Sequence, residues 1–273
     1  MGVDADTDAL AARDLLVSAA REAGALALEY FRPGSRTSAK VVTKAGGSPV
    51  TDADLAADLL LKRRLQDALP DAGWLSEETV DDFERLSRRS LIVVDPIDGT
   101  RAFVTGDPRW AVCAALVVDE RPIAGVVYAP ALDETYAAAR GEGATFNGAT
   151  LIPAAVWPPR AAAGPKLMIQ AMAAELGASV EITPRVPSLA YRMCMVARGA
   201  VDFAVSAENS HDWDIAAADI VLEEAGARLI DASGEQLRYN ARQVRRGALL
   251  AAPDTAASRL IRGFRAAIGS WPH

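Results

Sequence analysis

Two aspartates, Asp95 and Asp98, are the residues of this chain best placed for chemistry. They follow four aliphatic residues at 91–94, three of them β-branched, which predict a strand covered on both faces. Pro96 breaks that strand, so we expect it to end at Asp95 and both carboxylates to face one cavity. Hard oxygen ligands at this spacing suit magnesium or manganese, although a strand ending in an Asx-type turn without chemistry gives the same pattern.

The two residues that follow this pair point to an anion. Gly99 lets the backbone approach a bound anion closely, and Thr100 can cap a helix whose free N–H groups would receive a phosphate. Together, the two aspartates and this turn predict a site for metal ions and a phosphate.

Further acidic segments are candidates to complete such a site. Glu77 and Glu78 follow a short apolar stretch, and because adjacent strand residues point to opposite faces, only one of them is expected to enter a given site. Asp214 precedes an alanine-rich helix, where a metal ligand and a helix N-cap are about equally good interpretations. Asp54 lies where a helix over 55–69 opens, so stabilising its first turn is the alternative there.

Taken together, these segments resemble the magnesium-dependent, lithium-sensitive phosphomonoesterases of the inositol monophosphatase superfamily. The family's central motif, Asp-Pro-Ile/Leu-Asp-Gly-Thr followed by an aromatic, stands at 95–100 with Phe103, its Glu-Glu element at 77–78, and its Trp-Asp-x-Ala-Ala element at 213–217. The resemblance covers most of the chain. It implies an α/β (α+β) fold, a layered α-β-α-β-α sandwich of the inositol monophosphatase and fructose-1,6-bisphosphatase type.

The resemblance also implies a ligand set for two or three Mg²⁺ ions, with Mn²⁺ as a substitute. Glu77, Asp95 and the carbonyl of Ile97 would hold one ion. Asp95, Asp98 and Asp214 would hold a second. Two metals stabilise the attacking and the leaving oxygen of an in-line displacement, and they activate water without a histidine base.

The remaining roles that the resemblance implies lie around the reacting phosphate. Thr100, oriented by Asp54, would position the attacking water and help to deprotonate it, with Glu77 assisting. Gly99 and Thr100 would contact the phosphate. The expected activity is therefore that of a metal-dependent phosphoric monoester hydrolase with a small phosphorylated substrate.

Finer features resemble the bacterial 3′(2′),5′-bisphosphate nucleotidases, which implies hydrolysis of adenosine 3′,5′-bisphosphate to AMP and phosphate. These features are the entry segments 41–44 and 48–54, the Leu-Ser before the glutamate pair, the spacing from Asp202 to Asp214, and the segment 234–240. Such a substrate needs a second anion site, for which Arg192, Arg238 and Lys44 are the candidates. Each of them has the alternative of a solvated surface charge.

Other features favour different substrates. Ala102 stands in an Arg-Ala-Phe sequence that is also found in the superfamily's histidinol-phosphate phosphatases, and the Ser-Arg pair that normally opens the second domain is missing. Inositol-1-monophosphatase and histidinol-phosphate phosphatase are therefore the alternatives. A scaffold that binds metal or phosphate without catalysis is the more remote one.

The composition predicts a soluble, cytoplasmic enzyme. With 29 Lys and Arg against 36 Asp and Glu, the net charge is −7, which speaks against nucleic-acid binding. Cys113 and Cys194 lie in apolar runs and are interpreted as buried thiols. No run of about 18 apolar residues predicts a membrane span, and the acidic N-terminus is unlike an export signal. A homodimer and a monomer both stay open.

The elements that must position these residues can be placed along the chain. Helices are predicted at 8–31 and 52–69. Apolar and alternating runs at 110–118, 123–128 and 135–139 predict an antiparallel sheet that continues from the strand before Asp95.

A Pro- and Ala-rich stretch, 153–165, marks the expected domain boundary. It divides an N-terminal α+β domain, 1–152, which carries the Glu-Glu and central motifs, from a C-terminal α/β domain, 153–273. The second domain alternates short strands with helices and would supply Asp214 and substrate contacts.

Overall fold

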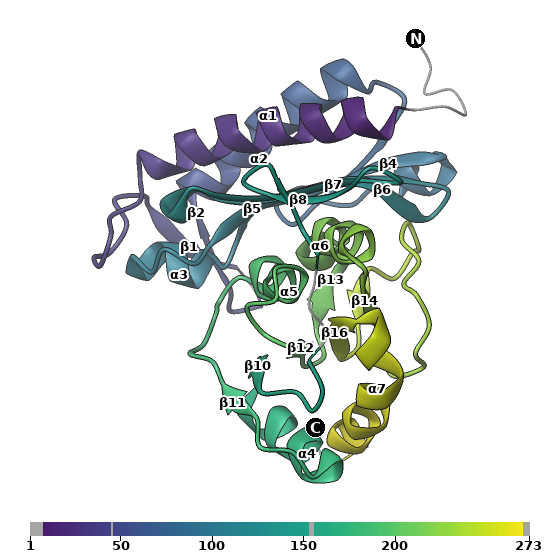
Figure 1. Ribbon diagram of the computed structural model, residues 1–273. Helices are drawn as coiled ribbons and strands as arrows, with labels where there is room; N and C mark the ends of the chain where they lie inside the picture. The colour runs from purple at the N-terminus through teal and green to yellow at the C-terminus, as the bar shows by residue number, and fades with distance from the viewer. Residues whose placement is uncertain (1–7, 45, 153–155, 270–273) are drawn as a thin grey trace.

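The computed structural model describes residues 8–44, 46–152 and 156–269, in which two main sheets lie one above the other with helices between and outside them (Figure 1). The helices are α1 (Ala9–Leu28), α2 (Asp52–Ala68), α3 (Thr100–Thr105), α4 (Lys166–Leu176), α5 (Leu189–Ala197), α6 (Asp212–Ala225) and α7 (Asp254–Gly269), with short 3₁₀ turns η1 (Glu84–Ser87) and η2 (Pro130–Leu132).

The larger sheet has seven strands in chain order. They are β3 (Gly73–Ser76), β4 (Ser90–Asp98), β5 (Ala111–Val118), β6 (Arg121–Ala129), β7 (Glu134–Ala139), β8 (Gly143–Phe146) and β9 (Ala149–Thr150). Only β3 and β4 pair in parallel within this sheet, and every later neighbour is antiparallel. The antiparallel sheet predicted from the sequence is confirmed.

The smaller sheet has five strands that are out of chain order. In space they run β11 (Glu181–Ile182), β10 (Ala161–Ala163), β12 (Phe203–Ser206), β16 (Leu249–Pro253) and β14 (Ala227–Ile230). Two short antiparallel ladders stand apart from both sheets. They join β1 (Val41–Thr43) to β2 (Pro49–Thr51) and β13 (Ser210–His211) to β15 (Arg245–Arg246).

The helices divide into three layers around the two sheets (Figure 1). Helices α1 and α2 cover the outer face of the seven-stranded sheet, α5 and α6 lie between the sheets, and α4 and α7 cover the outer face of the five-stranded sheet. This is the predicted α-β-α-β-α sandwich. None of the helices described is both long and apolar enough to cross a bilayer.

Strand β4 is buried on both faces because its apolar residues alternate between two cores. Leu91 and Val93 pack on the α5–α6 side, whereas Ile92 and Val94 pack on the α1–α2 side. The prediction of a doubly covered strand is therefore confirmed. Its predicted end at Asp95 is wrong, because β4 resumes pairing with β5 and ends at Asp98.

The middle helix layer lies unusually close to the sheet at Gly125 of β6. A β-carbon added there would come within 2.6 Å of a methyl of Ile220 and 3.0 Å of the carbonyl oxygen of Ala217. Both residues belong to α6, which is rich in alanine on this side. Small side chains on both surfaces thus let α6, which carries Asp214, press against the sheet that carries Asp95.

The structure also contains the two helices and the two buried thiols that the sequence predicted. The predicted helices at 8–31 and 52–69 are α1 and α2, with α1 ending three residues earlier, at Leu28. Cys113 and Cys194 are free and buried, as predicted. The expected domain boundary at residue 153 falls outside the described residues.

Candidate active site

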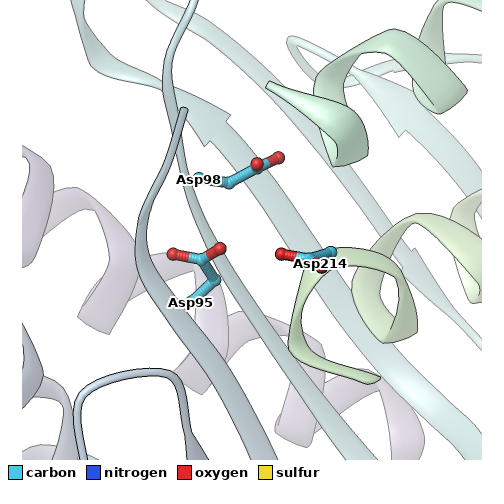
Figure 2. Close-up of side chains that lie close together, drawn as sticks. All are labelled: Asp95, Asp98 and Asp214. Atoms are coloured by element: carbon cyan, nitrogen blue, oxygen red, sulfur yellow. The ribbon is translucent and has the colours of Figure 1, made fainter. Parts of the chain in front are cut away.

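Three carboxylates from two distant parts of the chain meet in one cluster. Asp95 and Asp98 of β4 and Asp214 of α6 each offer an oxygen, and these three oxygens lie within 4.8 Å of one another (Figure 2). Asp95 is 1% exposed and Asp98 5% exposed. The structure thus brings together the three residues that the sequence predicted as ligands of one metal ion.

A β-bulge places Asp95 and Asp98 on the same face of the sheet. Asp95 pairs with Cys113 and Asp98 with Ala111, so three steps along β4 match two steps along β5. Without the extra residue, positions three apart would point to opposite faces. The bulge therefore turns both carboxylates toward the α5–α6 layer.

Asp98 is held by the start of α5. The Ser188 hydroxyl donates to Asp98 Oδ2 at 2.6 Å, the Ala190 N–H donates to the same oxygen at 2.7 Å, and the Leu189 N–H donates to Oδ1 at 3.1 Å. Burial, and then the charge of Asp214, raise the pKa of Asp98 to about 7 despite these bonds. Ser188 was not among the predicted site residues, although a serine before an apolar helix is an N-cap signal.

Asp95 is destabilised as an anion even more strongly. Its Oδ1 accepts the Ile97 N–H at 3.0 Å. Burial raises the pKa of Asp95 well above the usual value, and the charges of Glu77 and Asp98 raise it further. Oxygen donors that crowd in a dry interior fit a hard divalent cation, which would compensate their charge.

Asp214 lies in the first turn of α6 but is not its N-cap. The helix begins at Asp212, His211 is the N-cap, and the His211 backbone N–H donates to Asp214 Oδ2 at 2.6 Å. The N-cap interpretation of Asp214 is therefore wrong by three positions. The His211 ring stacks on Trp213 with centroids 4.5 Å apart.

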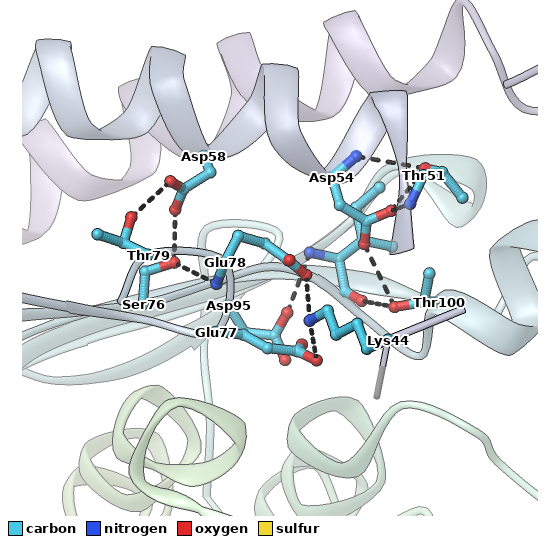
Figure 3. A network of polar contacts seen from close by, with 11 residues as sticks. Lys44, Thr51, Asp54, Asp58, Ser76, Glu77, Glu78, Thr79, Asp95 and Thr100 are labelled. Carbon is cyan, nitrogen blue, oxygen red and sulfur yellow. Dashed lines mark hydrogen bonds and ion pairs between the residues drawn. The ribbon is translucent and has the colours of Figure 1, made fainter. Parts of the chain in front are cut away.

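Glu77 and Glu78 both approach the site because β3 ends at Ser76, before them. Lys44 Nζ donates to Glu77 Oε1 at 3.0 Å and to Glu78 Oε1 at 2.8 Å (Figure 3). The expectation that only one of the two enters the site assumed a continuous strand, whereas the pair lies beyond β3 and both side chains contact one lysine. Burial raises the pKa of Glu78 to about 7. Lys44, predicted as a substrate contact, is bound to this pair.

A carboxylate that the sequence analysis missed supports the same segment (Figure 3). Asp58 of α2 accepts the hydroxyls of Ser76 at 2.5 Å and Thr79 at 2.9 Å, and Ser76 Oγ accepts the Glu78 N–H at 3.2 Å. Its signal in the sequence was only its place in α2, one turn after Asp54. The glutamate pair is thus tied to the outer helix layer.

Thr100 turns its hydroxyl to Asp54 instead of capping α3. Gly99 is the N-cap of α3, and Thr100 Oγ1 lies 3.3 Å from Asp54 Oδ1 and 3.1 Å from the Ile97 carbonyl oxygen (Figure 3). The helix-capping interpretation of Thr100 is therefore wrong, while the predicted neighbour Asp54 is in contact. Burial raises the pKa of Asp54 to about 6, although two hydrogen bonds from Thr51 oppose this.

Gly99 has a backbone reason to be glycine. Its φ is +92°, and a β-carbon would lie 3.2 Å from the Ser188 backbone nitrogen. The close approach at this position is thus made by the α5 start that binds Asp98.

A cavity of about 810 Å³ opens beside Asp214. Four cationic side chains line it, and none of them forms an ion pair within the described part of the chain; they are Arg101, Lys166, Arg185 and Arg192. Only Arg192 was predicted. The others come from segments whose sequence gave no sign that they meet.

Several buried polar atoms of the residues that line this cavity have no hydrogen-bond partner in the described residues. They are Arg192 Nε, Ser206 Oγ and Ser210 Oγ. Arg192 donates from Nη1 to the Val186 carbonyl at 3.2 Å, and burial lowers the pKa of its guanidinium. Unsatisfied polar groups around one cavity indicate a polar ligand.

Arg238 does not join this cavity. Its side chain is 76% exposed and pairs with Glu120 at 2.9 Å. The surface-charge interpretation of Arg238 describes its position in the structure, whereas Arg192 lines the cavity.

A layered fold with clustered carboxylates beside a cationic cavity is the arrangement of a phosphatase, and comparison with known proteins agrees. The sequence profile of the inositol monophosphatase family matches residues 10–268. The chain therefore belongs to the inositol monophosphatase family, whose members are metal-dependent phosphatases.

Similar proteins differ in the substrate that their names state. Inositol monophosphatase 2 of Solanum lycopersicum is 32% identical over 85% of this chain and 91% of its own length. A histidinol-phosphatase of Chlorobaculum parvum is 34% identical over 81% and 86%. The 3′(2′),5′-bisphosphate nucleotidase CysQ of Aggregatibacter actinomycetemcomitans is 31% identical over 84% and 87%.

A solved structure of an IMPase from Thermotoga maritima superposes on this chain with a TM-score of 0.79. It is 25% identical, and the match covers 94% of this chain and 97% of that one. The predicted fold class and superfamily are thus confirmed.

Replacing Asp95 with Asn should stabilise the metal-free protein, because it removes one repelling charge and keeps an acceptor for the Ile97 N–H. Above neutral pH, we expect the free energy of unfolding in EDTA to rise by about 1 kcal/mol. The stabilisation that saturating Mg²⁺ gives the wild type should nearly disappear. Urea unfolding with and without metal measures both effects.

The matched control for this variant is Asp71→Asn, since Asp71 is exposed and lies outside the cluster. It should change neither quantity. An Asp95→Asn protein that Mg²⁺ stabilises as much as the wild type would contradict the assignment of Asp95 as a metal ligand.

Proposed function

We propose that this enzyme is a magnesium-dependent 3′(2′),5′-bisphosphate nucleotidase that hydrolyses adenosine 3′,5′-bisphosphate to AMP and phosphate. The observation that carries the proposal is the cavity beside Asp214, whose lining holds four cationic side chains against two acidic ones, Asp214 and Glu208. None of the four cations forms an ion pair with a described residue. In a chain with a net charge of −7, such a concentration of positive charge favours an anion. A bisphosphate offers one phosphate to the metal site and a second to the cations.

Arg192 is the strongest candidate to bind the second phosphate. Its guanidinium is sheltered and has an unpartnered Nε, and a phosphate can accept two parallel bonds from the guanidinium fork. Ser206 and Ser210 carry buried hydroxyls without partners and line the same cavity. Their contribution would be neutral hydrogen bonds to the same anion or to the ribose.

The metal ligands would be those that the resemblance implied. Glu77, Asp95 and the Ile97 carbonyl would hold one Mg²⁺, and Asp95, Asp98 and Asp214 a second, with Mn²⁺ as a substitute. Bound there, the ions would neutralise charge on the phosphate and acidify a bound water.

Thr100 and Asp54 offer a route for the proton of the attacking water. The single hydroxyl hydrogen of Thr100 can point to Asp54 Oδ1, 3.3 Å away, which leaves its lone pairs free to accept a proton from water. As the water attacks, its proton passes to Thr100 Oγ1 and the hydroxyl proton passes to Asp54. Glu77 would help to orient the water.

A smaller ester is the second candidate substrate. Ala102 and the relatives at 32% and 34% identity, an inositol monophosphatase and a histidinol-phosphatase, favour it. The cavity argues against histidinol phosphate in particular, because the cationic amine of that ester would meet like charges.

The first test is the specificity constant for three substrates measured side by side. With Mg²⁺, we expect kcat/KM for adenosine 3′,5′-bisphosphate to exceed that for inositol 1-phosphate and for histidinol phosphate by about 100-fold, since one more desolvated charge pair forms. EDTA should abolish all three activities. A preference for either small ester would overturn the nucleotidase assignment and leave the phosphatase site unaffected.

Arg192→Met tests the second phosphate site directly. We expect KM for the bisphosphate to rise about tenfold or more, with little change for inositol 1-phosphate. The variant should fold, because no acidic partner of Arg192 would be left unpaired among the described residues. Arg238→Met, at an exposed site outside the cavity, is the control and should behave as the wild type. Equal losses on both substrates would show that Arg192 is not selective for a second phosphate.

Thr100→Val tests the proton route, since valine keeps the shape and removes the hydroxyl. We expect kcat to fall about 100-fold with KM nearly unchanged. The control is Thr105→Val in the same helix, whose hydroxyl donates to backbone carbonyls of Arg101 and Ala102. Wild-type kcat in Thr100→Val would exclude the hydroxyl from catalysis.

A further inference from the structure

Residues 238–246 form a strap that connects α6 and β13 with the segment that holds Arg85. At its end, β15 pairs with β13, with Ser210 opposite Arg246 and His211 opposite Arg245. Near its start, the Tyr239 hydroxyl donates to Asp219 Oδ2 of α6 at 2.8 Å. The strap thus contacts α6 directly and also the strand that leads into it.

The strap meets the first residue of α6 through a buried ion pair. Arg246 Nε and Nη2 each lie 2.6 Å from Asp212 Oδ1, and Asp212 is 0% exposed. Asp212 Oδ2 has no hydrogen-bond partner in the part of the chain that the structure describes. A buried carboxylate is strongly unfavourable without a compensating cation, so Arg246 stabilises Asp212 as the first residue of α6.

Arg246 is itself fixed on three sides. Its Nη2 donates to the Arg238 carbonyl at 2.5 Å, its guanidinium lies over the Tyr239 ring at 5.1 Å, and its own carbonyl accepts the Asn209 N–H at 3.0 Å. The guanidinium is therefore a rigid anchor for Asp212, and a flexible side chain would not serve in the same way.

The middle of the strap is bound to the segment that follows the glutamate pair. Arg85, which is 1% exposed, donates to Asn240 Oδ1 and to the Ala241 carbonyl oxygen, both at 3.0 Å. Arg85 also pairs with Asp81 at 2.7 Å, in the segment that follows Glu78. One short stretch of chain thus connects the region of the glutamate pair with the start of α6.

We propose that Arg246 and Asp212 position Asp214 for metal binding, an inference that rests on the metal ligands of the proposed function. Asp214 lies two residues after Asp212 in the first turn of α6, and its Oδ2 is held by the His211 N–H at 2.6 Å. His211 pairs with the strap, and Asp212 is clamped by it. The strap therefore sets where Asp214 stands relative to Asp95 and Asp98. Arg246 is a positioning residue that acts through α6.

The test is binding of Mg²⁺ alone, measured by calorimetry on the full chain without substrate, together with thermal unfolding in EDTA. Arg246→Met should raise the dissociation constant about tenfold or more, as loss of an outer support of a metal ligand typically does. Arg246→Lys, which keeps the charge but not the fork, should give a smaller rise. Arg245→Met, an exposed neighbour on the same strand, should bind as the wild type.

Since Arg246→Met leaves Asp212 buried and unpaired, the double variant Asp212→Asn with Arg246→Met decides the case where the single one does not fold. We expect the double variant to fold and to bind Mg²⁺ about tenfold or more weakly than the wild type. A double variant that binds Mg²⁺ as tightly as the wild type would overturn the inference, even with a lowered unfolding temperature. A wild-type chain that binds no Mg²⁺ would instead overturn the proposed function.

Discussion

The charge repulsion among Asp95, Asp98 and Asp214 is the constraint around which this structure is arranged. The three carboxylates approach within 4.8 Å, with Asp95 and Asp98 buried and Asp214 at the edge of the cavity. The two buried groups would each be more stable as anions without the others. Hydrogen bonds from the start of α5, from His211 and from Ile97 satisfy their oxygens. Those bonds replace the hydrogen bonds to water, but the negative charge of the cluster stays uncompensated. The cluster therefore lowers the stability of the fold and favours binding of a cation.

The geometry that imposes this repulsion comes from elements that are individually ordinary. A one-residue bulge turns Asp98 to the face of Asp95, and the small residues of α6 let that helix press against β6 at Gly125. The strap then fixes the first turn of α6. Each element prevents one movement by which the carboxylates could separate. Packing that lies far from the cluster therefore compensates the repulsion within it.

The sequence predicted the features that nearby residues determine. It did not predict the features that depend on contacts between distant parts of the chain. Strand β4, the helices α1 and α2, and the candidate ligands Asp95 and Asp98 follow from apolar runs and turn residues within ten positions. The bulge could not be predicted, because it is defined by the register with β5. The error for Asp214 has a similar origin, since the start of α6 at Asp212 depends on Arg246, more than thirty positions away.

Of the arginines predicted to bind substrate, Arg192 lines the cavity and Arg238 does not, and the sequence could not distinguish them. All Lys and Arg look alike in sequence, and exposure is their default. The cavity gathers Arg101 from α3, Lys166 from α4 and Arg185 from the loop before α5, which come together only when the two sheets stack.

The lining of this cavity carries charges of both signs, with Asp214 and Glu208 beside the four cationic side chains. Asp214 belongs both to the carboxylate cluster and to the cavity lining, so the cluster and the four cationic side chains lie next to each other. Under the proposed function, a ligand with two phosphates would place one phosphate at the carboxylate cluster with its metal ions and the other at the cationic side chains of the cavity. A ligand with one phosphate would leave the cationic side chains of the cavity without an anionic partner. It would also lack the orientation that these side chains impose. Under the proposed function, a change among the cationic side chains alone would therefore alter the substrate preference of this chain while the carboxylate cluster stays the same.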